Sequence, residues 1–268
     1  MFAKTEATAR DPEQYEHFMG RWSRRLAGPF LDFSGIGGGD RVLDVGCGTG
    51  VLTSALTERG SKAVGIDGSE AYLASARRNR PHPDVTYELS DVRHIPYSDA
   101  SFDACVSTLV LDIIPEFDQV VREMRRVTRP GGVVASAVFD FWGGFSASTL
   151  IYDTGSVLDE GIRALRDDVR AHPLVRANAQ ADLWRKTGLV NVVEEPIVIS
   201  FDYILFEDYW SSFSAGPTRI AQASVCYPLR CALKYRSMFG PGTCLACLMG
   251  HDHSQSLSAP CEARCRLD

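Results

Sequence analysis

The sequence has no apolar run long enough to cross a bilayer, no block of Lys or Arg, and no internal repeat. A membrane helix needs about 18 or more apolar residues in succession, so no span is predicted. The net charge is -6 and the pI is about 5.6, which argues against a surface for nucleic acid or anionic lipid. The N-terminal stretch MFAKTEATARDPEQ lacks the apolar core of a secretion signal. We therefore expect a cytoplasmic protein with no nucleic-acid partner and no membrane partner.

Cysteine is scarce in most of the chain, because Cys47 and Cys105 are its only cysteines before residue 222. The last 47 residues hold the other six and carry 5 Lys and Arg against 3 Asp and Glu, whereas the first 221 residues carry 23 against 31. We therefore expect residues 222–268 to be an atypical Cys-rich tail, and we hypothesise an altered end, such as a shifted reading frame. A zinc site built on Cys244 and Cys247 is the alternative, but no second ligand pair with matching spacing follows. No metal site is assigned.

Strand and helix patterns alternate over the first 140 residues. Asp11 and Pro12 start a helix that we expect to reach about Leu26, within an N-terminal helical cap over residues 1–40. Apolar runs then predict strands, and helical spacing predicts helices between them; the strands are 42–45, 62–66, 85–89, 102–108 and 133–140, and the later helices are 69–80 and 115–127. This alternation predicts an α/β fold with a doubly wound, mostly parallel sheet.

The pattern loosens after Asp140. Residues 141–175 read as a helical insertion, with a helix over 151–169, that we expect to act as a lid between the fifth and sixth strands. A helix over 177–187, a sixth strand over 190–199 and a helix over 207–213 are predicted to follow. The main domain is therefore expected to span residues 41–221.

The stretch RVLDVGCGTG, residues 41–50, places three glycines directly after the first strand. In an open parallel sheet, ligands bind beyond the carboxyl ends of the strands, and glycine lets a ligand approach the backbone. The next helix directs its free N–H groups at the same place. A dinucleotide site has the pattern G-x-G-x-x-G, but Val51 stands where its third glycine belongs, and no Tyr-x3-Lys pair is present. An NAD-dependent oxidoreductase therefore remains only an alternative.

Four segments in order resemble the class I S-adenosylmethionine (SAM) dependent methyltransferases. They are VLDVGCGTG at 42–50, GIDGSE at 65–70, SDVRHIPYSDASFDACVS at 90–107 and EMRRVTRPGG at 123–132. The resemblance is to small-molecule members of the ubiquinone-biosynthesis and methyltransferase type 11 groups, and it covers about residues 11–215. It implies a Rossmann-like fold, SAM as the cofactor, and in-line transfer of a methyl group to a small-molecule acceptor.

Asp67 follows the second strand, 21 residues beyond Gly46, where a carboxylate can accept hydrogen bonds from both ribose hydroxyls. It is predicted to hold the cofactor's sugar, although a turn-capping role is the alternative. Gly68 and Ser69 are expected to flank the ribose and adenine. Ser69 also fits a helix N-cap.

The resemblance places three further residues around the cofactor. The carboxylate of Asp91 is implied to accept from the adenine amino group, while the backbone N–H of Val92 binds a ring nitrogen. Ser107 is implied to border the methionine part. A turn at Asp91 and core packing at Ser107 are the alternative interpretations.

The remaining cofactor candidates surround the glycines. Asp44, between apolar neighbours in a central strand, needs a buried partner and is implied to order the glycine loop, with Gly46, Cys47, Gly48 and Gly50 forming the loop itself. Cys47 is interpreted as a small buried residue and not as a nucleophile. Tyr15 and Arg24, or Arg21, are expected to close over the cofactor from the first helix, with a solvated helix face as the alternative for the arginines.

No catalytic residue is assigned, because SAM carries an activated methyl group and a general base is needed only if the acceptor loses a proton. Family members often have a His after the fourth strand, where this chain has Asp112, which we interpret as a residue at the helix start. A SAM-fold protein that binds without catalysing is a further alternative. The identity of the acceptor is left open.

Overall fold

The computed structural model describes residues 11–176 and 178–214. These residues form two compact units: unit 1 contains the described residues up to Trp142 and from Arg170 to Ser200, and unit 2 contains Gly143–Val169 and the described residues from Phe201 onward. The predicted Cys-rich tail, 222–268, lies outside the described residues.

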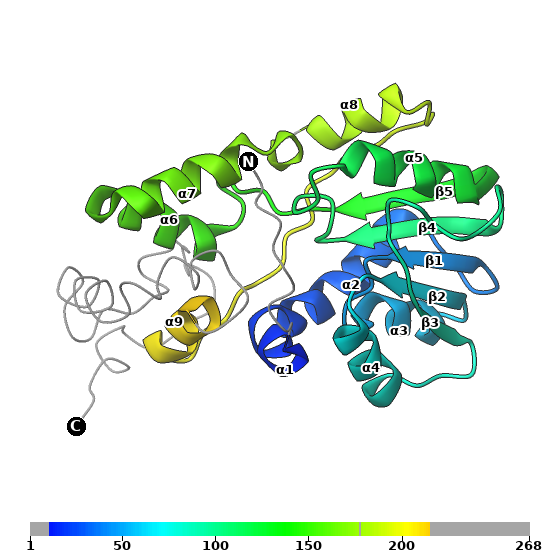
Figure 1. Cartoon of the computed structure of the whole chain (residues 1–268), viewed down its shortest axis with the longest axis horizontal. Coiled ribbons are helices and arrows are strands. Elements are labelled where there is room, and N and C mark those ends of the chain that lie inside the picture. The colour runs from blue at the N-terminus through cyan, green and yellow to red at the C-terminus, as the bar shows by residue number, and fades with distance from the viewer. Residues whose placement is uncertain (1–10, 177, 215–268) are drawn as a thin grey trace, which may run out of the picture. The chain divides into compact units, whose positions relative to one another are not determined.

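Unit 1 is built on a five-stranded sheet with the order β3-β2-β1-β4-β5, in which every pairing is parallel. Figure 1 shows the strands side by side, with β3 and β5 at the two edges. The strands are β1 (Arg41–Val45), β2 (Lys62–Asp67), β3 (Val85–Leu89), β4 (Phe102–Thr108) and β5 (Thr128–Ala137). The predicted doubly wound parallel α/β fold is confirmed. The strand order reverses between β1 and β4, so the ligand edge of the fold lies beyond their carboxyl ends.

The helices belong to both units, and those of unit 1 connect the strands and flank the sheet (Figure 1). In chain order they are α1 (Pro12–Tyr15), a π-helical turn (Glu16–Gly20), α2 (Arg21–Ser34), α3 (Val51–Glu58), α4 (Glu70–Asn79), α5 (Phe117–Val127), α6 (Ser146–Leu158), α7 (Glu160–Ala171), a short 3-10 turn (Pro173–Val175), α8 (Ala179–Lys186) and α9 (Phe206–Ser214). No helix in the described part of the chain has the length and apolar character needed to span a membrane.

The sheet is buried on both faces because alternate residues of each strand enter different clusters. Val42 packs with residues of α2 and α3, whereas Leu43 and Val45 pack with residues of α5 and α8. Strands covered on both sides must be apolar almost throughout, which is why the sequence shows unbroken runs there. The double cover fixes the carboxyl ends of β1, β2 and β4 relative to one another.

The first predicted helix extends further than expected. It ends at Ser34 instead of about Leu26, and Glu16–Gly20 forms a π-helical turn within it. Its start is as predicted, since the Asp11 side chain accepts a hydrogen bond from the N–H of Glu13 and Pro12 stands in the first turn. The helix ends where Gly35 adopts a φ of 65°. Gly28 and Pro29 lie inside the helix.

Two strand predictions were wrong. β5 begins at Thr128, not after the Pro130–Gly132 turn, because a register shift opposite Phe102 and Ala104 accommodates the extra residues. Residues 190–199 form no strand. Val192 packs against one core cluster and Ile197 and Ile199 against the other, but the segment is not hydrogen-bonded into the described sheet, whose edge strand on this side is β5.

The predicted helix over 151–169 is two helices, α6 and α7, separated at Asp159. In unit 2, the Tyr209 hydroxyl of α9 donates to the carbonyl of Ala147 in α6 at 2.7 Å. The Phe145 ring lies 5.0 Å from that of Phe201 and 6.2 Å from that of Phe213. Unit 2 thus has an aromatic core of its own.

Candidate functional site

The glycine turn joins β1 to α3 with a backbone that only glycine adopts readily. Gly46, Gly48 and Gly50 have φ values of 75°, 55° and 84°. The N–H groups of Gly46 and Cys47 donate to the carbonyl of Ile66 on β2, at 2.8 and 2.9 Å. The turn is therefore fixed to the end of the neighbouring strand.

Each glycine of the turn is needed for a different reason. A Cβ at Gly46 would lie 2.5 Å from Val110, and one at Gly50 would lie 2.5 Å from the hydroxyl of Tyr87. A Cβ at Gly48 would meet nothing closer than the Tyr15 hydroxyl, at 3.7 Å. Close packing therefore demands Gly46 and Gly50, whereas Gly48 faces the side chain that covers the turn.

Asp67 lies at the end of β2 and is buried. Its two carboxylate oxygens accept from the backbone N–H of Gly48 at 2.9 Å and of Ser69 at 2.8 Å. The sequence predicted a carboxylate directed at a ribose, and the structure brings it against the glycine turn. Each oxygen has a second lone pair, so this arrangement is compatible with accepting from two further hydroxyls.

Asp44 lies beneath the turn with its side chain almost completely buried. The Thr53 hydroxyl of α3 donates to it at 2.6 Å. Burial raises the pKa of Asp44 to about 7, and the nearby negative charge of Asp67 adds to the rise, while the hydrogen bonds from Thr53 oppose it. Asp44 ties β1 to α3, which fits the predicted role in ordering the loop.

Cys47 is buried next to Gly65, whose added Cβ would lie 2.9 Å from the Cys47 sulfur. Burial, followed by the charges of Asp44 and Asp67, raises the pKa of its thiol well above the usual value. A thiol held in this protonated form is a poor nucleophile. The interpretation of Cys47 as a small core residue agrees with these surroundings.

Asp91 follows β3 and is exposed. Arg93 donates to both of its oxygens, at 2.9 and 2.8 Å, and this interaction lowers the pKa of Asp91 to about 2. The Asp91 carboxylate is thus paired with Arg93, two residues further on, as expected if Asp91 stabilises a turn. Val92, the predicted adenine contact, packs against the core cluster that contains α5.

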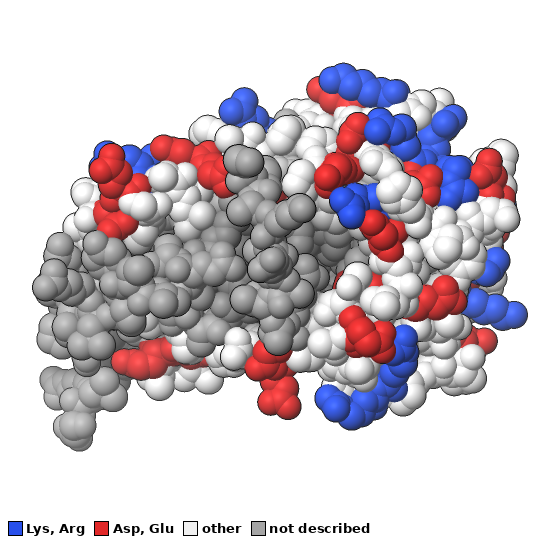
Figure 2. All heavy atoms as spheres, viewed as in Figure 1, with Lys and Arg blue, Asp and Glu red and all other residues white. Residues whose placement is uncertain are grey.

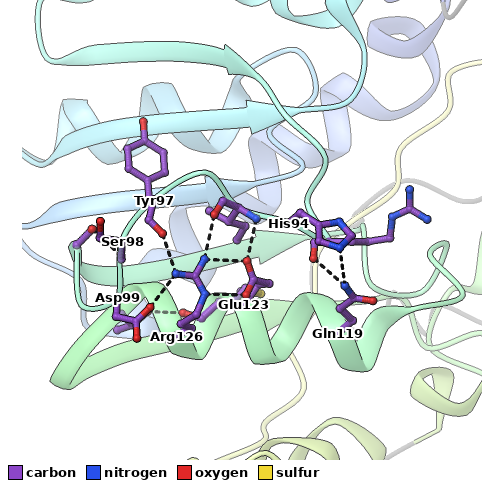
Figure 3. A network of polar contacts seen from close by, with 12 residues as sticks. His94, Tyr97, Ser98, Asp99, Gln119, Glu123 and Arg126 are labelled. Carbon is purple, nitrogen blue, oxygen red and sulfur yellow. Dashed lines mark hydrogen bonds and ion pairs between the residues drawn. The ribbon is translucent and has the colours of Figure 1, made fainter.

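A polar network anchors the loop after Asp91 to α5. Arg126 donates to the carbonyls of Ile95 and Tyr97, at 2.9 and 2.7 Å, and pairs with Asp99 and Glu123 (Figure 3). Gln119 donates to the carbonyl of Arg93 at 3.0 Å. Since α5 itself packs on β4 and β5, the loop has a fixed position relative to the sheet edge.

The remaining strand-end candidates have structural partners. The buried Ser107 hydroxyl donates to the Val45 carbonyl at 2.9 Å and so joins the ends of β4 and β1. Ser69 is the N-cap of α4, where its hydroxyl accepts from the N–H of Tyr72 at 3.4 Å. Gly68 has ample room, because an added Cβ would meet only the Ser90 carbonyl, at 4.0 Å.

Tyr15 and its neighbours cover the glycine turn from the N-terminal helices. The Tyr15 ring lies 5.0 Å from that of Tyr72, and burial raises the pKa of the Tyr15 hydroxyl above its usual range. A small cavity of about 20 Å3 lies between these elements. It is lined by Tyr15, Ser23, Leu26, Ala27, Gly46, Cys47, Thr49, Val51, Leu52 and Thr108.

Glu16 holds this cover in place, and sequence reasoning missed it. Its carboxylate accepts from the Thr49 hydroxyl at 2.5 Å, from Arg24 at 2.6 Å and from Arg80 at 3.0 Å. Arg80 also donates to the Thr49 carbonyl at 2.7 Å. Burial disfavours the charge, but the hydrogen bonds from Thr49 and Arg24 prevail and lower the pKa of Glu16. Arg24, predicted as a cofactor contact, here binds Glu16.

Asp112 is buried and does not start a helix, since α5 begins at Phe117. One of its oxygens, Oδ1, has no hydrogen-bond partner among the residues that the structure describes. Burial raises the pKa of Asp112 to about 6, and backbone groups of Asp112 itself and of Phe139 oppose the rise. The interpretation as a helix-start residue is therefore replaced by that of an incompletely paired buried carboxyl.

No group of three or more His, Cys, Asp or Glu side chains within the described residues is arranged to hold a metal ion. The candidate ligands in the tail, from Cys244 onward, lie outside that range.

Comparison with known proteins gives the class of the domain. Residues 43–136 match the family model described as "Methyltransferase domain". Over 126 residues the chain is 36% identical to a malonyl-[acyl-carrier protein] O-methyltransferase from Erwinia pyrifoliae, covering 47% of this chain and 46% of the relative. Over 119 residues it is 36% identical to a demethylmenaquinone methyltransferase from Beutenbergia cavernae, covering 44% and 49%.

A solved structure, an S-adenosylmethionine dependent methyltransferase from Mesorhizobium loti, is similar with a TM-score of 0.40 and 27% identity, over 44% of this chain and 55% of that one. In the two curated relatives named above, the matched stretch spans about half of their length. The carboxyl ends of β1 and β4 lie where a parallel α/β sheet of this order places its ligand edge. Residues 43–136 are similar to the methyltransferase domain family, so the resemblance stated from the four motifs is confirmed over this segment.

Proposed function

We propose that the protein is a SAM-dependent methyltransferase that transfers a methyl group to a small-molecule acceptor. One observation carries the proposal: within a methyltransferase domain, three glycines with positive φ and the buried carboxylate of Asp67 meet at the ligand edge of the sheet. Bare backbone beside a fixed carboxylate suits a ligand that has both an unphosphorylated ribose and a charged head.

The cofactor is proposed to lie along the ends of β1, β2 and β4. Gly46, Gly48 and Gly50 would present backbone to it, with Asp44 and Cys47 supporting the turn from below. Asp67 would accept from the ribose hydroxyls, flanked by Gly68 and Ser69. In the same proposal Asp91 and Val92 contact the adenine, Ser107 borders the methionine part, and Tyr15 and Arg24 cover the site.

When bound, SAM would supply a methyl group already activated by the positive sulfonium. The chain's own task is then to position the acceptor in line and to exclude water. Such alignment can contribute about 7–11 kcal/mol in favourable cases. The segment covering the turn, held by Glu16, is suited to excluding water because it lies directly over Gly48.

The names of the relatives support methyl transfer and leave the acceptor open. One acts on a malonyl-[acyl-carrier protein] and the other on demethylmenaquinone. We propose a small-molecule acceptor, no nucleic-acid partner and a cytoplasmic location. Figure 2 supports the proposal that nucleic acid is not a partner, because Lys and Arg are interspersed with Asp and Glu over the described part of the face shown. We further propose that residues 11–40, the described part of the predicted cap over 1–40, cover the cofactor.

Calorimetry with SAM, S-adenosylhomocysteine and NAD tests the proposal. The first two should bind and NAD should not. Asp67→Asn should weaken SAM binding at least about 10-fold, since a charge-assisted hydrogen bond contributes about 1.5–3 kcal/mol. Asp40→Asn, which alters a half-buried carboxylate before β1 that accepts from the N–H of Gly37, is the matched control. Binding of NAD alone would favour the oxidoreductase alternative, and SAM binding without turnover on any acceptor would favour a non-catalytic binding protein.

A further inference from the structure

Two arginines lie over the ring of Trp142, which follows the carboxyl end of β5 and is 51% exposed. The guanidinium carbon of Arg170 lies 5.6 Å from the centre of the indole ring, and that of Arg176 lies 5.2 Å from it. All three residues belong to unit 1. A guanidinium commonly stacks on an indole, but two of them on one ring bring like charges close together. Such an arrangement is complementary to a negatively charged group.

Both arginines extend from backbone that the fold holds in place. Arg170 is half-buried, and its Nε donates to the carbonyl of Phe141 at 3.1 Å. Arg176 directly follows the short 3-10 turn, in which the buried Leu174 belongs to the core cluster that contains residues of α5. The two cations therefore reach the Trp142 ring from anchored positions on either side of that turn.

Two acidic side chains near this cluster in the sequence accept from backbone N–H groups. Asp140 accepts from the N–H of Trp142 at 2.8 Å, and Glu194 accepts from two N–H groups at the start of α8, at 2.6 and 2.8 Å. Arg176 has no hydrogen bond and no ion pair within the part of the chain that the structure describes. Its side chain is exposed, so a dissolved molecule can reach the guanidinium donors without any rearrangement.

The cluster lies on the β5 side of the ligand edge. β5 ends at Ala137, whose carbonyl accepts from the N–H of Leu109, in the turn after β4, at 2.8 Å. A chain spans at most about 3.6 Å per residue, so Trp142 stays close to that edge. The proposed cofactor contacts run from Asp91, after β3, to Ser107, at the end of β4, with the methionine part at the β4 end. Since β5 is the next strand beyond β4, the cluster lies on the side of the reacting sulfur and away from the adenine.

We propose that Arg170, Arg176 and Trp142 form an anion-binding subsite that recognises a carboxylate or phosphate group of the methyl acceptor. This inference rests on the proposed function and adds the chemical class of the acceptor to it. A guanidinium donates two parallel hydrogen bonds to an oxyanion of either kind. The half-exposed indole offers an apolar surface to the body of the same molecule. The acceptor is therefore a small organic acid or a phosphate ester.

Binding of two simple anions tests the subsite without any turnover. Benzoate and phenyl phosphate, titrated in the presence of S-adenosylhomocysteine, should shift the indole N–H resonance of Trp142, which Trp142→Phe assigns, and benzyl alcohol should not. Arg176→Gln should weaken binding of the better anion about 10-fold or more, because a charged, forked contact is lost. Arg185→Gln, which alters an exposed arginine of α8 outside the cluster, is the matched control. Equal weakening in both variants, an equal response to benzyl alcohol, or no response to either anion overturns the inference.

Turnover links the subsite to the acceptor. A cell extract freed of macromolecules is separated by anion exchange, and tritium transfer from methyl-labelled SAM is measured with the retained and the unretained fraction. We expect methylation in the retained fraction. Arg176→Gln should need about 10-fold more of that fraction for its half-maximal rate, with the maximal rate and SAM binding unchanged, because the contact is made equally in the ground state and the transition state.

Phosphatase treatment of the retained fraction distinguishes the two anions, since it abolishes methylation of a phosphate ester and leaves that of a carboxylate. Methylation confined to the unretained fraction, or an unchanged half-maximal amount for Arg176→Gln, contradicts the inference. A wild-type protein that binds no SAM, or that binds it and methylates neither fraction, instead contradicts the proposed function.

Discussion

Single residues of the glycine turn illustrate how backbone and packing constraints combine. Gly50 has a φ of 84°, and an added Cβ would lie 2.5 Å from the Tyr87 hydroxyl. Gly39 has a φ of 92°, but an added Cβ there would meet nothing within 4 Å. The two glycines therefore share the conformational constraint and differ in the steric one.

We expect Gly39→Ala to lower the free energy of unfolding by about 1–2 kcal/mol, the cost of a side chain in the left-handed region. Gly50→Ala should add about 1–3 kcal/mol to that loss, because the rigid, buried Tyr87 ring must shift. Urea unfolding of both variants measures the difference. Equal losses would show that Tyr87 does not determine the need for glycine at this position.

Asp44 should make stability depend on pH in an unusual direction. Its pKa in the folded protein is about 7, against a usual value of 3.8, so the folded state binds more protons than the unfolded state between these values. The free energy of unfolding contributed by Asp44 is therefore highest below pH 3.8 and falls as pH rises towards 7.

Asp44→Asn removes this titration and keeps an oxygen that can accept from Thr53. The unfolding free energy of the variant relative to wild type should rise between pH 4 and 7, by about 1.4 kcal/mol per unit of pKa shift. Carboxyls that do not interact with Asp44 titrate alike in both proteins and cancel in the difference. A difference that stays constant over this range would contradict the raised pKa.

Among the elements, the N-terminal helices gain their place over the glycine turn from Glu16. This carboxylate contacts Thr49, Arg24 and Arg80, which are 33, 8 and 64 residues away in the sequence. Such separations explain why the sequence alone did not reveal it. The spacing of residues in a short stretch of sequence predicts one face of a helix, but it does not predict which residues of another element will contact that face.

Glu16→Gln should loosen this cover. If SAM binds beneath it as proposed, the variant should release SAM about 5- to 30-fold faster, equivalent to about 1–2 kcal/mol for weakened charged hydrogen bonds. Stopped-flow displacement measures the rate, with Glu13→Gln on exposed α1 as the matched control. Unchanged release in Glu16→Gln, or an equal change in Glu13→Gln, would show that the clamp does not retain the cofactor.

The sequence predicted strands well where the residues of the strand are mostly apolar and a turn residue follows them. The strands ending at Val45 and Asp67 are apolar on both faces, and glycine or Ser69 marks the turn that follows each. The segment 190–199 has a similar share of apolar residues, yet strand formation also needs hydrogen bonds to a neighbouring strand, and the described sheet ends at β5 without it. Likewise, the sequence predicted Asp67 at the ligand edge but did not predict the hydrogen bonds that it accepts from the N–H groups of Gly48 and Ser69.

At the scale of the whole molecule, the chain is divided into two units with separate cores. The sheet and its covering helices make up unit 1, and the Phe145 and Tyr209 cluster belongs to unit 2. All proposed cofactor contacts lie in unit 1. Ligand binding stabilises the cooperative unit that contains the site, so hydrogen exchange can show whether the two units unfold together.

We expect SAM at 100 times its Kd to slow exchange of core amides in β1 and β4 about 100-fold, equivalent to about 2.7 kcal/mol. Amides of α6, such as that of Tyr152, should exchange at an unchanged rate, because unit 2 can open while unit 1 stays folded. Mass spectrometry of peptides from both units measures this, with NAD as the control ligand. Equal slowing in α6 would mean that the two units unfold as one. No slowing in β1 would place the ligand elsewhere, since the glycine turn continues directly from that strand.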